Sequence, residues 1–200
     1  MANKTTVALT EEQYYTLIEV ISNGIEQNDI KLKPNPKVAT ILMLEANLGL
    51  RLSDILSLRL CDIIKDGNRY RLDIVEQKTS KKRKFTVPLE IYSFIQDYAL
   101  ENGIGPRAKL FRISERGVQK CLKKAVDAIN YENIGSHSFR KFFATSIYEE
   151  NNYNIEMVRI LLQHSSVAVT QRYLGVQQKE IEDALQKHIK LGVKRAKNSV

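Results

Sequence analysis

Residues 136–173 read SHSFRKFFATSIYEENNYNIEMVRILLQHSSVAVTQRY and hold two of the three histidines of the chain, His137 and His164. Arg140 follows the first histidine by three residues, and Tyr173 closes the segment. His137 and Arg140 share one face of a helix, because residues i and i+3 are neighbours there. Arginine, histidine and tyrosine on adjacent helices would form an anion pocket with a phenol at its rim. Such a pocket suits in-line attack by the protein on a phosphodiester.

The composition is ordinary for a globular protein. The chain has 200 residues, of which 43% are hydrophobic and 27% charged, enough for one domain with a core. No apolar run approaches the roughly 20 residues of a membrane span, and the N-terminus has no apolar secretory segment. Cys61 and Cys121 lie far apart, in neither a disulfide nor a metal-binding pattern. We therefore expect a cytoplasmic protein without a membrane span, metal site or cofactor.

The chain is basic, with a formal net charge of +8 and a sequence pI near 9.4. A basic domain favours a polyanion, most often nucleic acid or an anionic membrane surface. One group of cations lies at a predicted hairpin tip: Lys78, Lys81, Lys82, Arg83 and Lys84. A second lies near the C-terminus: Lys187, Lys190, Lys194, Arg195 and Lys197. We interpret the first as a nucleic-acid contact, and the second as either such a contact or a solvated tail.

Helical periodicity covers most of the chain. Thr10 with Gln13 forms a capping-box pattern, and Pro36 suits the first turn of a second helix. Gly49 interrupts that helix, and Ser53 is a predicted N-cap for the next, which places Arg51 on the turn between them. Further apolar stripes predict helices that begin near these residues: Pro88, Ser114, Ser136 or Ser138, Ile155, Ser166 and Ile181.

Between residues 63 and 87 the hydrophobic period changes to two. Residues 70–74 and 84–87 each alternate apolar and polar side chains, which predicts two half-buried strands, and residues 63–64 predict a short strand before them. Together these segments predict a small antiparallel sheet. The expected fold class is mainly α with one small antiparallel β-sheet (α+β), in a single domain without internal repeats.

Several candidate residues have two interpretations from the sequence alone. An arginine among leucines is costly to bury unless its fork is satisfied, so Arg51 could pair with Asp54, three residues on, or face a phosphate while Asp54 orients it. Tyr173 could be a nucleophile or a core-edge residue. His164 could serve in the site or cap a helix, and the His137–Arg140 pair could be an exposed polar patch.

Five motifs, in this order, resemble the catalytic domain of tyrosine recombinases, also called phage integrases. They are Leu48–Asp54, Gln77–Thr79, His137–Arg140 with Phe143–Thr145, Leu162–Ser166 and Thr170–Tyr173. Each motif alone is weak, but the five occur in the family's order on the expected elements. The resemblance covers roughly residues 10–191, which leaves a basic tail at residues 192–200.

The resemblance implies that Tyr173 attacks the scissile phosphate, forms a 3′-phosphotyrosyl link and releases a 5′-hydroxyl, without a metal ion. A free phenol has a pKa near 10, so only about one in a thousand is ionised at pH 7. Attack therefore needs help with the proton and with charge on the phosphoryl oxygens. Arg51 and Arg140 offer bidentate forks, typically worth about 10²–10³-fold each, and His137 and His164 donate to the phosphate or handle a proton.

The family's remaining roles fall on the hairpin and its surroundings. Lys78 resembles the lysine that protonates the leaving 5′-oxygen, although Lys81, Lys82 and Lys84 compete for that role. Asp54 would orient Arg51 or a histidine. The residues that we expect to contact DNA are Lys81, Lys82, Arg83, Lys84 and Lys141.

Four positions depart from the usual pattern of the family. Lys141 stands where a histidine is common, Phe139 replaces a leucine, Gln163 a glycine and Asp54 a glutamate. Every proposed reacting group is still present. Family members usually carry an N-terminal helical DNA-binding domain, whereas the catalytic pattern begins almost at once in this sequence. We therefore expect one catalytic domain over residues 1–200, without that additional domain.

The expected activity is breakage and rejoining of double-stranded DNA for a mobile element. Family members act as tetramers on paired sites, so a last helix at residues 181–191 would dock on a neighbouring protomer or pack within its own. Two alternatives remain. The first is a non-catalytic DNA-binding module that keeps the fold, and the second is an enzyme similar to type IB topoisomerases.

Overall fold

The computed structural model describes residues 6–78, 80–175, 185–186 and 188. In this part of the chain, the helices are α1 (Glu11–Asn23), α2 (Pro36–Leu48), α3 (Leu52–Ser57), α4 (Leu89–Glu101), α5 (Glu115–Ala128), α6 (Ser136–Glu150), α7 (Ile155–Leu162) and α8 (Val167–Leu174), with a 3-10 turn η1 (Leu60–Asp62). The strands are β1 (Ile25–Gln27), β2 (Ile30–Leu32), β3 (Ile63–Asp66), β4 (Arg69–Val75) and β5 (Lys82–Val87). The predicted fold class, mainly α with a small antiparallel sheet, is confirmed, and the structure contains a second such sheet.

Helix starts follow the predicted caps with two exceptions. The Thr10 side chain accepts from the Gln13 N–H in a full capping box, and Ser166 caps α8. The predicted cap at Ser53 is wrong, since α3 begins at Leu52 with Arg51 in the N-cap position. The carbonyl oxygen of Arg51 accepts from the N–H groups of Asp54 and Ile55, so the helix begins before Ser53. Helix α6 likewise has Gly135 at its N-cap, so neither predicted serine serves there.

The three predicted strands form one antiparallel sheet in the order β3-β4-β5. Its register places Leu72 opposite Phe85 and Ile74 opposite Arg83. A second, two-stranded sheet, β1-β2, was missed by the sequence prediction. Its turn residues, Asn28 and Asp29, both have positive φ, at 53° and 59°. Two such residues between short alternating segments are a signal for a tight hairpin.

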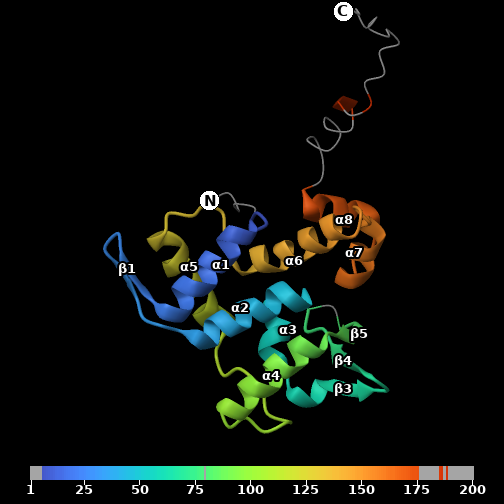
Figure 1. Cartoon of the computed structure of the whole chain (residues 1–200), viewed down its shortest axis with the longest axis horizontal. Helices are drawn as coiled ribbons and strands as arrows, with labels where there is room; N and C mark the ends of the chain where they lie inside the picture. The colour runs from blue at the N-terminus through green and yellow to red at the C-terminus, as the bar shows by residue number, and fades with distance from the viewer. Residues whose placement is uncertain (1–5, 79, 176–184, 187, 189–200) are drawn as a thin grey trace, which may run out of the picture.

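Helix α2 lies at the centre of the main core and is packed by α1, α3, α5 and α6 (Figure 1). Gly49 ends this helix with φ 55°, and a Cβ there would lie 2.3 Å from the Phe143 ring of α6. Glycine therefore serves both the left-handed turn and the close approach of the two helices. This contact brings the turn after α2 beside α6.

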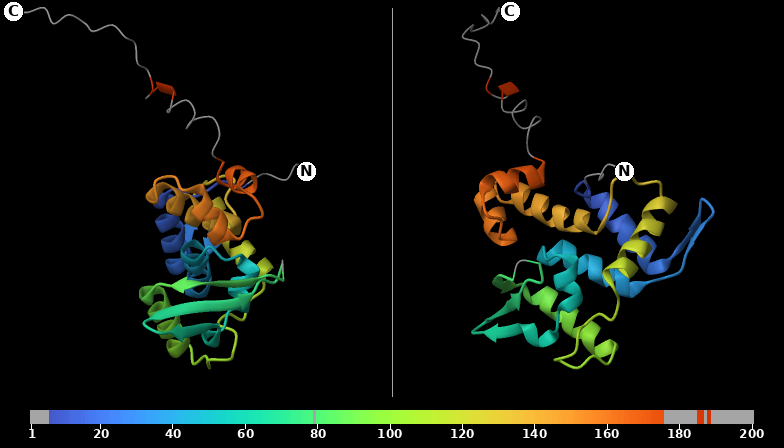
Figure 2. Two further views of the ribbon diagram at one scale, coloured as in Figure 1. Left: turned by 90° about the vertical axis from the view of Figure 1, so that its right-hand side faces the viewer. Right: turned by 180° about the vertical axis from the view of Figure 1, so that it is seen from behind.

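A second, smaller core joins the C-terminal half of α6 to α7 and α8 around Ala144, Tyr148, Val158 and Leu162. Figures 1 and 2 show that α7 and α8 and the β3-β4-β5 sheet lie at the same end of the molecule, with the end of α2 and α3 nearby. This arrangement brings residues from four separate parts of the sequence toward one place.

Among the described residues, no helix has both the length and the apolar character that crossing a membrane would require. Cys61 is exposed and Cys121 buried, and neither forms a disulfide. The predicted last helix at residues 181–191 and the basic tail fall largely outside the described residues.

Candidate active site

Arg140 is the most buried of the predicted site residues, with 1% of its surface exposed. It projects from the first turns of α6. Its Nη1 donates to the carbonyl oxygen of Gly49 at 2.6 Å, and its Nη2 donates to the carbonyl oxygen of Leu162 at 3.2 Å. Both acceptors lie at helix C-termini, where carbonyl groups without helical partners carry partial negative charge. The guanidinium is therefore fixed between the ends of α2 and α7 before any ligand binds.

Arg51 lies on the turn between α2 and α3 and keeps 21% of its side chain exposed. Its Nη1 is 2.5 Å from Oε2 of Glu76, a carboxylate that the sequence reasoning had not singled out. The predicted pairing of Arg51 with Asp54 is therefore wrong. Its spacing argument assumed that both residues are helical, but Arg51 has extended backbone, with φ −74° and ψ 153°.

Asp54 has a different role in the structure. Its side chain is buried, and Oδ1 accepts a hydrogen bond from the backbone N–H of Gln77 at 2.8 Å. Gln77 immediately precedes Lys78. Asp54 thus holds the backbone at the base of the loop that carries Lys78. Its position therefore affects Lys78 more directly than it affects Arg51.

The two histidines flank Tyr173. The ring centroids of His137 and Tyr173 lie 5.7 Å apart at 83°, and those of His164 and Tyr173 lie 5.1 Å apart at 72°. Both are edge-to-face contacts within the usual range for rings. The side chains predicted from the segment 136–173 are therefore brought together around the phenol.

The hydrogen bond of His164 determines its tautomer. Its Nδ1 lies 3.1 Å from Oγ1 of Thr170, whose hydroxyl donates in turn to the carbonyl oxygen of Ser166 at 3.4 Å. With its hydroxyl directed to Ser166, Thr170 offers a lone pair to the imidazole, an arrangement that favours the proton on Nδ1. This leaves Nε2 with a lone pair that can accept a proton.

Both histidines are neutral at pH 7. Desolvation, followed by the charges of Arg140 and Arg51, lowers the pKa of His164 to about 4. Desolvation and the cations Arg140, Lys141, Arg51 and Lys78 lower the pKa of His137 to about 4. Desolvation is the larger cause for His137, but the residue is exposed, so we give more weight to the neighbouring cations. Neutral imidazoles are proton acceptors, and a bound phosphate would oppose the effect of the cations.

The Tyr173 phenol is held in its protonated form. Burial raises its pKa to about 12, although the charge of Arg140 acts in the opposite direction. The hydroxyl is buried, and among the described residues it makes no hydrogen bond of standard distance and angle, although the Arg140 guanidinium lies close enough to favour the phenolate. At such a pKa roughly one molecule in 10⁵ is ionised at pH 7. A nucleophilic Tyr173 would therefore need a proton acceptor and a stronger positive field than the site has in this state.

Lys141, on the same helix as Arg140, also lies next to the phenol. Its Nζ is 5.5 Å from the centroid of the Tyr173 ring and donates to the carbonyl oxygen of Thr6 at 2.7 Å. It thus connects the segment before α1 to the surroundings of the phenol. Its predicted contact with DNA stays a prediction.

The basic hairpin divides into exposed and buried residues. Lys78, Lys81, Lys82 and Lys84 are exposed, and Lys84 pairs with Asp73 at 2.9 Å. Arg83 is only 2% exposed, so the prediction that it contacts DNA is wrong. It lies on the inner face of β5, where its Nη1 is 3.1 Å from Oε1 of Glu76.

These distances describe a site made of two arginines, two neutral histidines and a protonated phenol, with an exposed lysine hairpin beside it. A model of the family described as the phage integrase family matches residues 7–180. The chain belongs to the phage integrase family.

Two curated relatives illustrate the similarity. The chain is 33% identical over 153 residues to the probable integrase/recombinase YoeC of Bacillus subtilis (strain 168), covering 72% of this chain and 81% of YoeC. It is 28% identical over 193 residues to tyrosine recombinase XerC of Caldanaerobacter subterraneus subsp. tengcongensis, covering 91% of this chain and 51% of XerC. The chain thus spans about half the length of that XerC.

Solved structures agree on the fold. The catalytic domain of bacteriophage HP1 integrase matches with a TM-score of 0.63 at 20% identity, over 92% of this chain and 95% of the HP1 chain. XerH recombinase in a post-cleavage complex with a palindromic difH substrate matches with a TM-score of 0.67 at 20% identity, over 92% of this chain and 54% of XerH. The integrase catalytic-domain fold is therefore shown for this chain.

One departure from the integrase pattern has a structural explanation. Gln163, where a glycine is usual, has a left-handed backbone with φ 55° and ψ 38°. Glycine adopts this conformation at no steric cost, which accounts for its use there. In this chain Gln163 also donates from Nε2 to the carbonyl oxygen of Lys82 at 3.0 Å. It therefore links the turn before His164 to the hairpin.

Sequence reasoning missed Glu76, Gln163 and Thr170 as parts of this candidate site. A signal existed for Glu76, since residues 72, 74 and 76 share one face of a strand, and an acid at an inward position must be paired. For Gln163 and Thr170 no local pattern indicated a partner. Their contacts depend on how the turn between α7 and α8 meets its neighbours.

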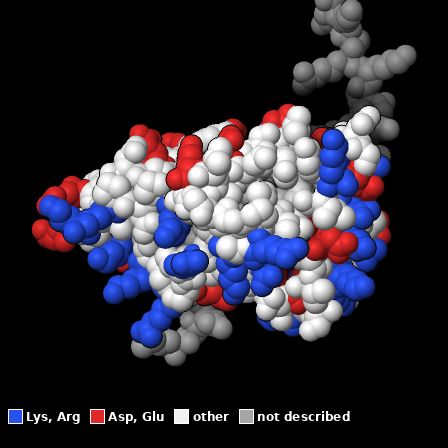
Figure 3. Space-filling model, turned by 90° about the horizontal axis from the view of Figure 1, so that it is seen from below, with Lys and Arg blue, Asp and Glu red and all other residues white. Residues whose placement is uncertain are grey.

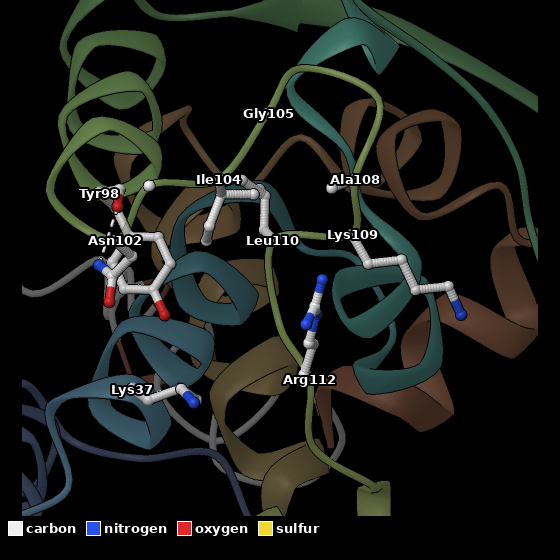
Figure 4. Close-up of a pocket in the computed structure, with 10 residues that line it drawn as sticks. Lys37, Tyr98, Asn102, Ile104, Gly105, Ala108, Lys109, Leu110 and Arg112 are labelled. Atoms are coloured by element: carbon white, nitrogen blue, oxygen red, sulfur yellow. Dashed lines mark hydrogen bonds between the residues drawn. The ribbon is translucent and has the colours of Figure 1, made fainter.

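Basic side chains form a broken band across one face of the molecule, with acidic side chains mostly in separate groups (Figure 3). A separate cavity of about 270 Å³ lies beside the end of α4, where Lys37, Tyr98 and Arg112 surround the same space (Figure 4). None of the six predicted catalytic residues lines it. Among the described residues, no group of three or more His, Cys, Asp or Glu side chains could hold a metal ion.

Proposed function

We propose that the chain cleaves and rejoins double-stranded DNA through a covalent bond between Tyr173 and a 3′-phosphate. The observation that carries this proposal is the position of the phenol, between two neutral imidazoles and beside an arginine that the fold holds in place. If Tyr173 were only a packing residue at the edge of the core, nothing would require two imidazoles and a guanidinium around its ring. Membership of the phage integrase family supports the same reaction.

In the proposed reaction a phosphodiester lies between Arg51 and Arg140. The two guanidinium groups donate to the non-bridging oxygens, which carry increased charge in the transition state. The phenolic oxygen of Tyr173 forms a bond to phosphorus as the bond to the 5′-oxygen breaks. The phenolic proton passes to a neutral histidine, and Nε2 of His164 is the acceptor that its tautomer provides.

The leaving 5′-oxygen takes a proton from Lys78, the hairpin lysine that the family resemblance designates. The phosphotyrosyl bond conserves the free energy of the broken phosphodiester, so a 5′-hydroxyl can reverse the reaction without ATP. Arginines, histidines and a lysine supply all the charge and proton transfer in this scheme, and the proposal therefore assigns no step to a metal ion.

The biological setting is part of the proposal. The relatives named as integrases and recombinases support a role in DNA recombination, which we assign to integration or excision of a mobile element in the cytoplasm. The XerH structure includes its difH substrate, which supports a double-stranded DNA partner. We further propose a tetramer on paired sites, with a catalytic unit at residues 10–191 and a basic tail at residues 192–200.

Covalent trapping tests the proposed function. Wild-type protein and Tyr173→Phe are incubated with nicked duplexes tiled across the flanks of the protein's own gene, with and without EDTA. An adduct that survives SDS and EDTA and is absent from the variant is the expected result. Binding without an adduct would favour a non-catalytic DNA-binding module. Relaxation of supercoiled DNA without recombination would favour a topoisomerase-like enzyme.

A further inference from the structure

Glu76 connects Arg51, on the turn between α2 and α3, with Arg83 of β5. Its side chain is 1% exposed, and its two carboxylate oxygens have different partners. Oε2 is 2.5 Å from Nη1 of Arg51, and Oε1 is 3.1 Å from Nη1 of Arg83. A buried carboxylate between two guanidinium groups is stabilised in its ionised form, because each charge-assisted hydrogen bond favours the anion.

The second partner, Arg83, extends this connection to Arg140. Nη2 of Arg83 lies 3.3 Å from the carbonyl oxygen of Gly49, which also accepts from Arg140 at 2.6 Å. Arg83 itself is buried, and desolvation lowers its pKa to about 10. The three arginines and Glu76 thus form one network around the turn after α2, in which the carboxylate offsets the repulsion among the cations.

Glu76 also lies where the loop of Lys78 leaves the sheet. Its N–H donates to the carbonyl oxygen of Lys81 at 2.9 Å, and its own carbonyl oxygen accepts from Ser80 at 2.9 Å. The same residue therefore closes the loop by its backbone and holds Arg51 by its side chain. A shift of Glu76 would displace a phosphate-binding group and the lysine loop together.

We propose that Glu76 is a positioning residue for the cleavage reaction. It directs the guanidinium of Arg51 toward the phosphate and sets the base of the Lys78 loop relative to it. This inference rests on the proposed function and concerns a buried residue that acts through Arg51. Its effect is expected on the rate of cleavage more than on DNA affinity, because misplacement of a charge-stabilising group by about 1 Å can cost roughly 10²-fold in rate.

The first experiment is a two-residue cycle. Single-turnover adduct formation on the nicked duplex is measured for wild type, Glu76→Gln, Arg51→Ala and the double variant. Glu76→Gln keeps the shape of the side chain and removes its charge, and we expect cleavage to slow about 10–100-fold. If Glu76 acts through Arg51, the substitution will have little further effect when Arg51 is absent. Glu132→Gln, at an exposed carboxylate, is the matched control.

A second variant separates positioning from folding. Glu76→Met with Arg83→Met replaces a buried ion pair by apolar side chains of similar volume, a change that often leaves stability unaltered. We expect this protein to melt near the wild-type temperature, yet to cleave as slowly as Glu76→Gln. Wild-type cleavage by the double variant would show that the pair serves folding alone, and would overturn the inference.

The possible failures are distinguishable. A wild-type protein that forms no Tyr173 adduct would overturn the proposed function, and the positioning role of Glu76 with it. A wild-type protein that forms the adduct, together with additive effects of Glu76→Gln and Arg51→Ala, would overturn the positioning role only. Loss of cleavage with normal melting and a non-additive cycle would support both.

Discussion

The two sides of the site differ in how their functional groups are held. On the side of α6, α7 and α8, Arg140 and the Tyr173 hydroxyl are buried, and Arg140 is bonded to backbone carbonyls. On the side of the β4–β5 hairpin, Lys78 is exposed, and only the base of its loop is fixed by buried residues. Groups that must stabilise charge are therefore set in advance, whereas the group that would meet the leaving oxygen remains accessible to DNA.

The largest effect is expected at the phenol. Tyr173→Phe removes the nucleophilic oxygen, so covalent adduct on the nicked duplex should be undetectable while DNA binding is kept. Because the hydroxyl is buried without a hydrogen-bond partner of ordinary geometry, its removal should leave stability within about 1 kcal/mol of wild type. Denaturant unfolding and gel-resolved adducts check the two parts. Adduct formation by the variant would move the nucleophile to another residue.

The next pair compares the two sides directly. Lys78→Ala should slow cleavage by about 10²–10⁴-fold with no change in melting temperature, because the side chain is an exposed general acid. Arg140→Ala should slow cleavage by at least about 10²-fold and also lower the melting temperature, because its guanidinium joins the ends of α2 and α7.

A substrate with sulfur in place of the bridging 5′-oxygen separates the two roles. A thiolate leaves without a proton, since thiols have pKa values near 8.5. This substrate should restore cleavage by Lys78→Ala and not by Arg140→Ala. Rescue of a Lys81, Lys82 or Lys84 variant instead would assign the general acid to that lysine.

Neighbouring residues of β5 give a third comparison. Arg83→Ala leaves the buried carboxylate of Glu76 with one fewer partner and should destabilise the fold by about 3–5 kcal/mol. Lys84→Ala, at an exposed residue, should change the free energy of unfolding by less than about 0.5 kcal/mol. If Lys84 contacts one phosphate, the slope of log K for DNA binding against log salt concentration should fall by about 1. Urea unfolding and binding titrations at several salt concentrations measure both. Equal stability of the two variants would contradict the buried assignment of Arg83.

A last comparison concerns pH. His137 and His164 have folded pKa values of about 4, below the unfolded value near 6.5, so between these values the unfolded chain binds more protons. Stability should therefore fall as the pH drops from about 6.5 to 4. Substituting glutamine for both histidines should flatten this part of the curve of melting temperature against pH. A curve identical to wild type would mean that the histidines titrate normally in the folded protein.

The helices and their order could be predicted because the relevant patterns are local. The caps at Thr10 and Ser166 and the glycine at Gly49 depend on a few adjacent residues, and the structure confirms the elements that they delimit. The sheet could be predicted for the same reason. Arg83 alternates with Phe85 and Val87, which places it on the inner face of the strand. The prediction that it contacts DNA followed the dense group of lysines around it instead of this alternation.

The sequence alone determined which chemistry was available: arginines, histidines and a tyrosine in an order shared with one family, on elements whose periodicity is visible in single segments. Only the tertiary structure decided how these groups are held. Three contacts join residues that are 7 to 81 positions apart in the sequence: Arg51 with Glu76, Arg83 with Glu76, and Gln163 with Lys82. Such contacts depend on how helices and sheet pack, and local propensity carries no record of that packing.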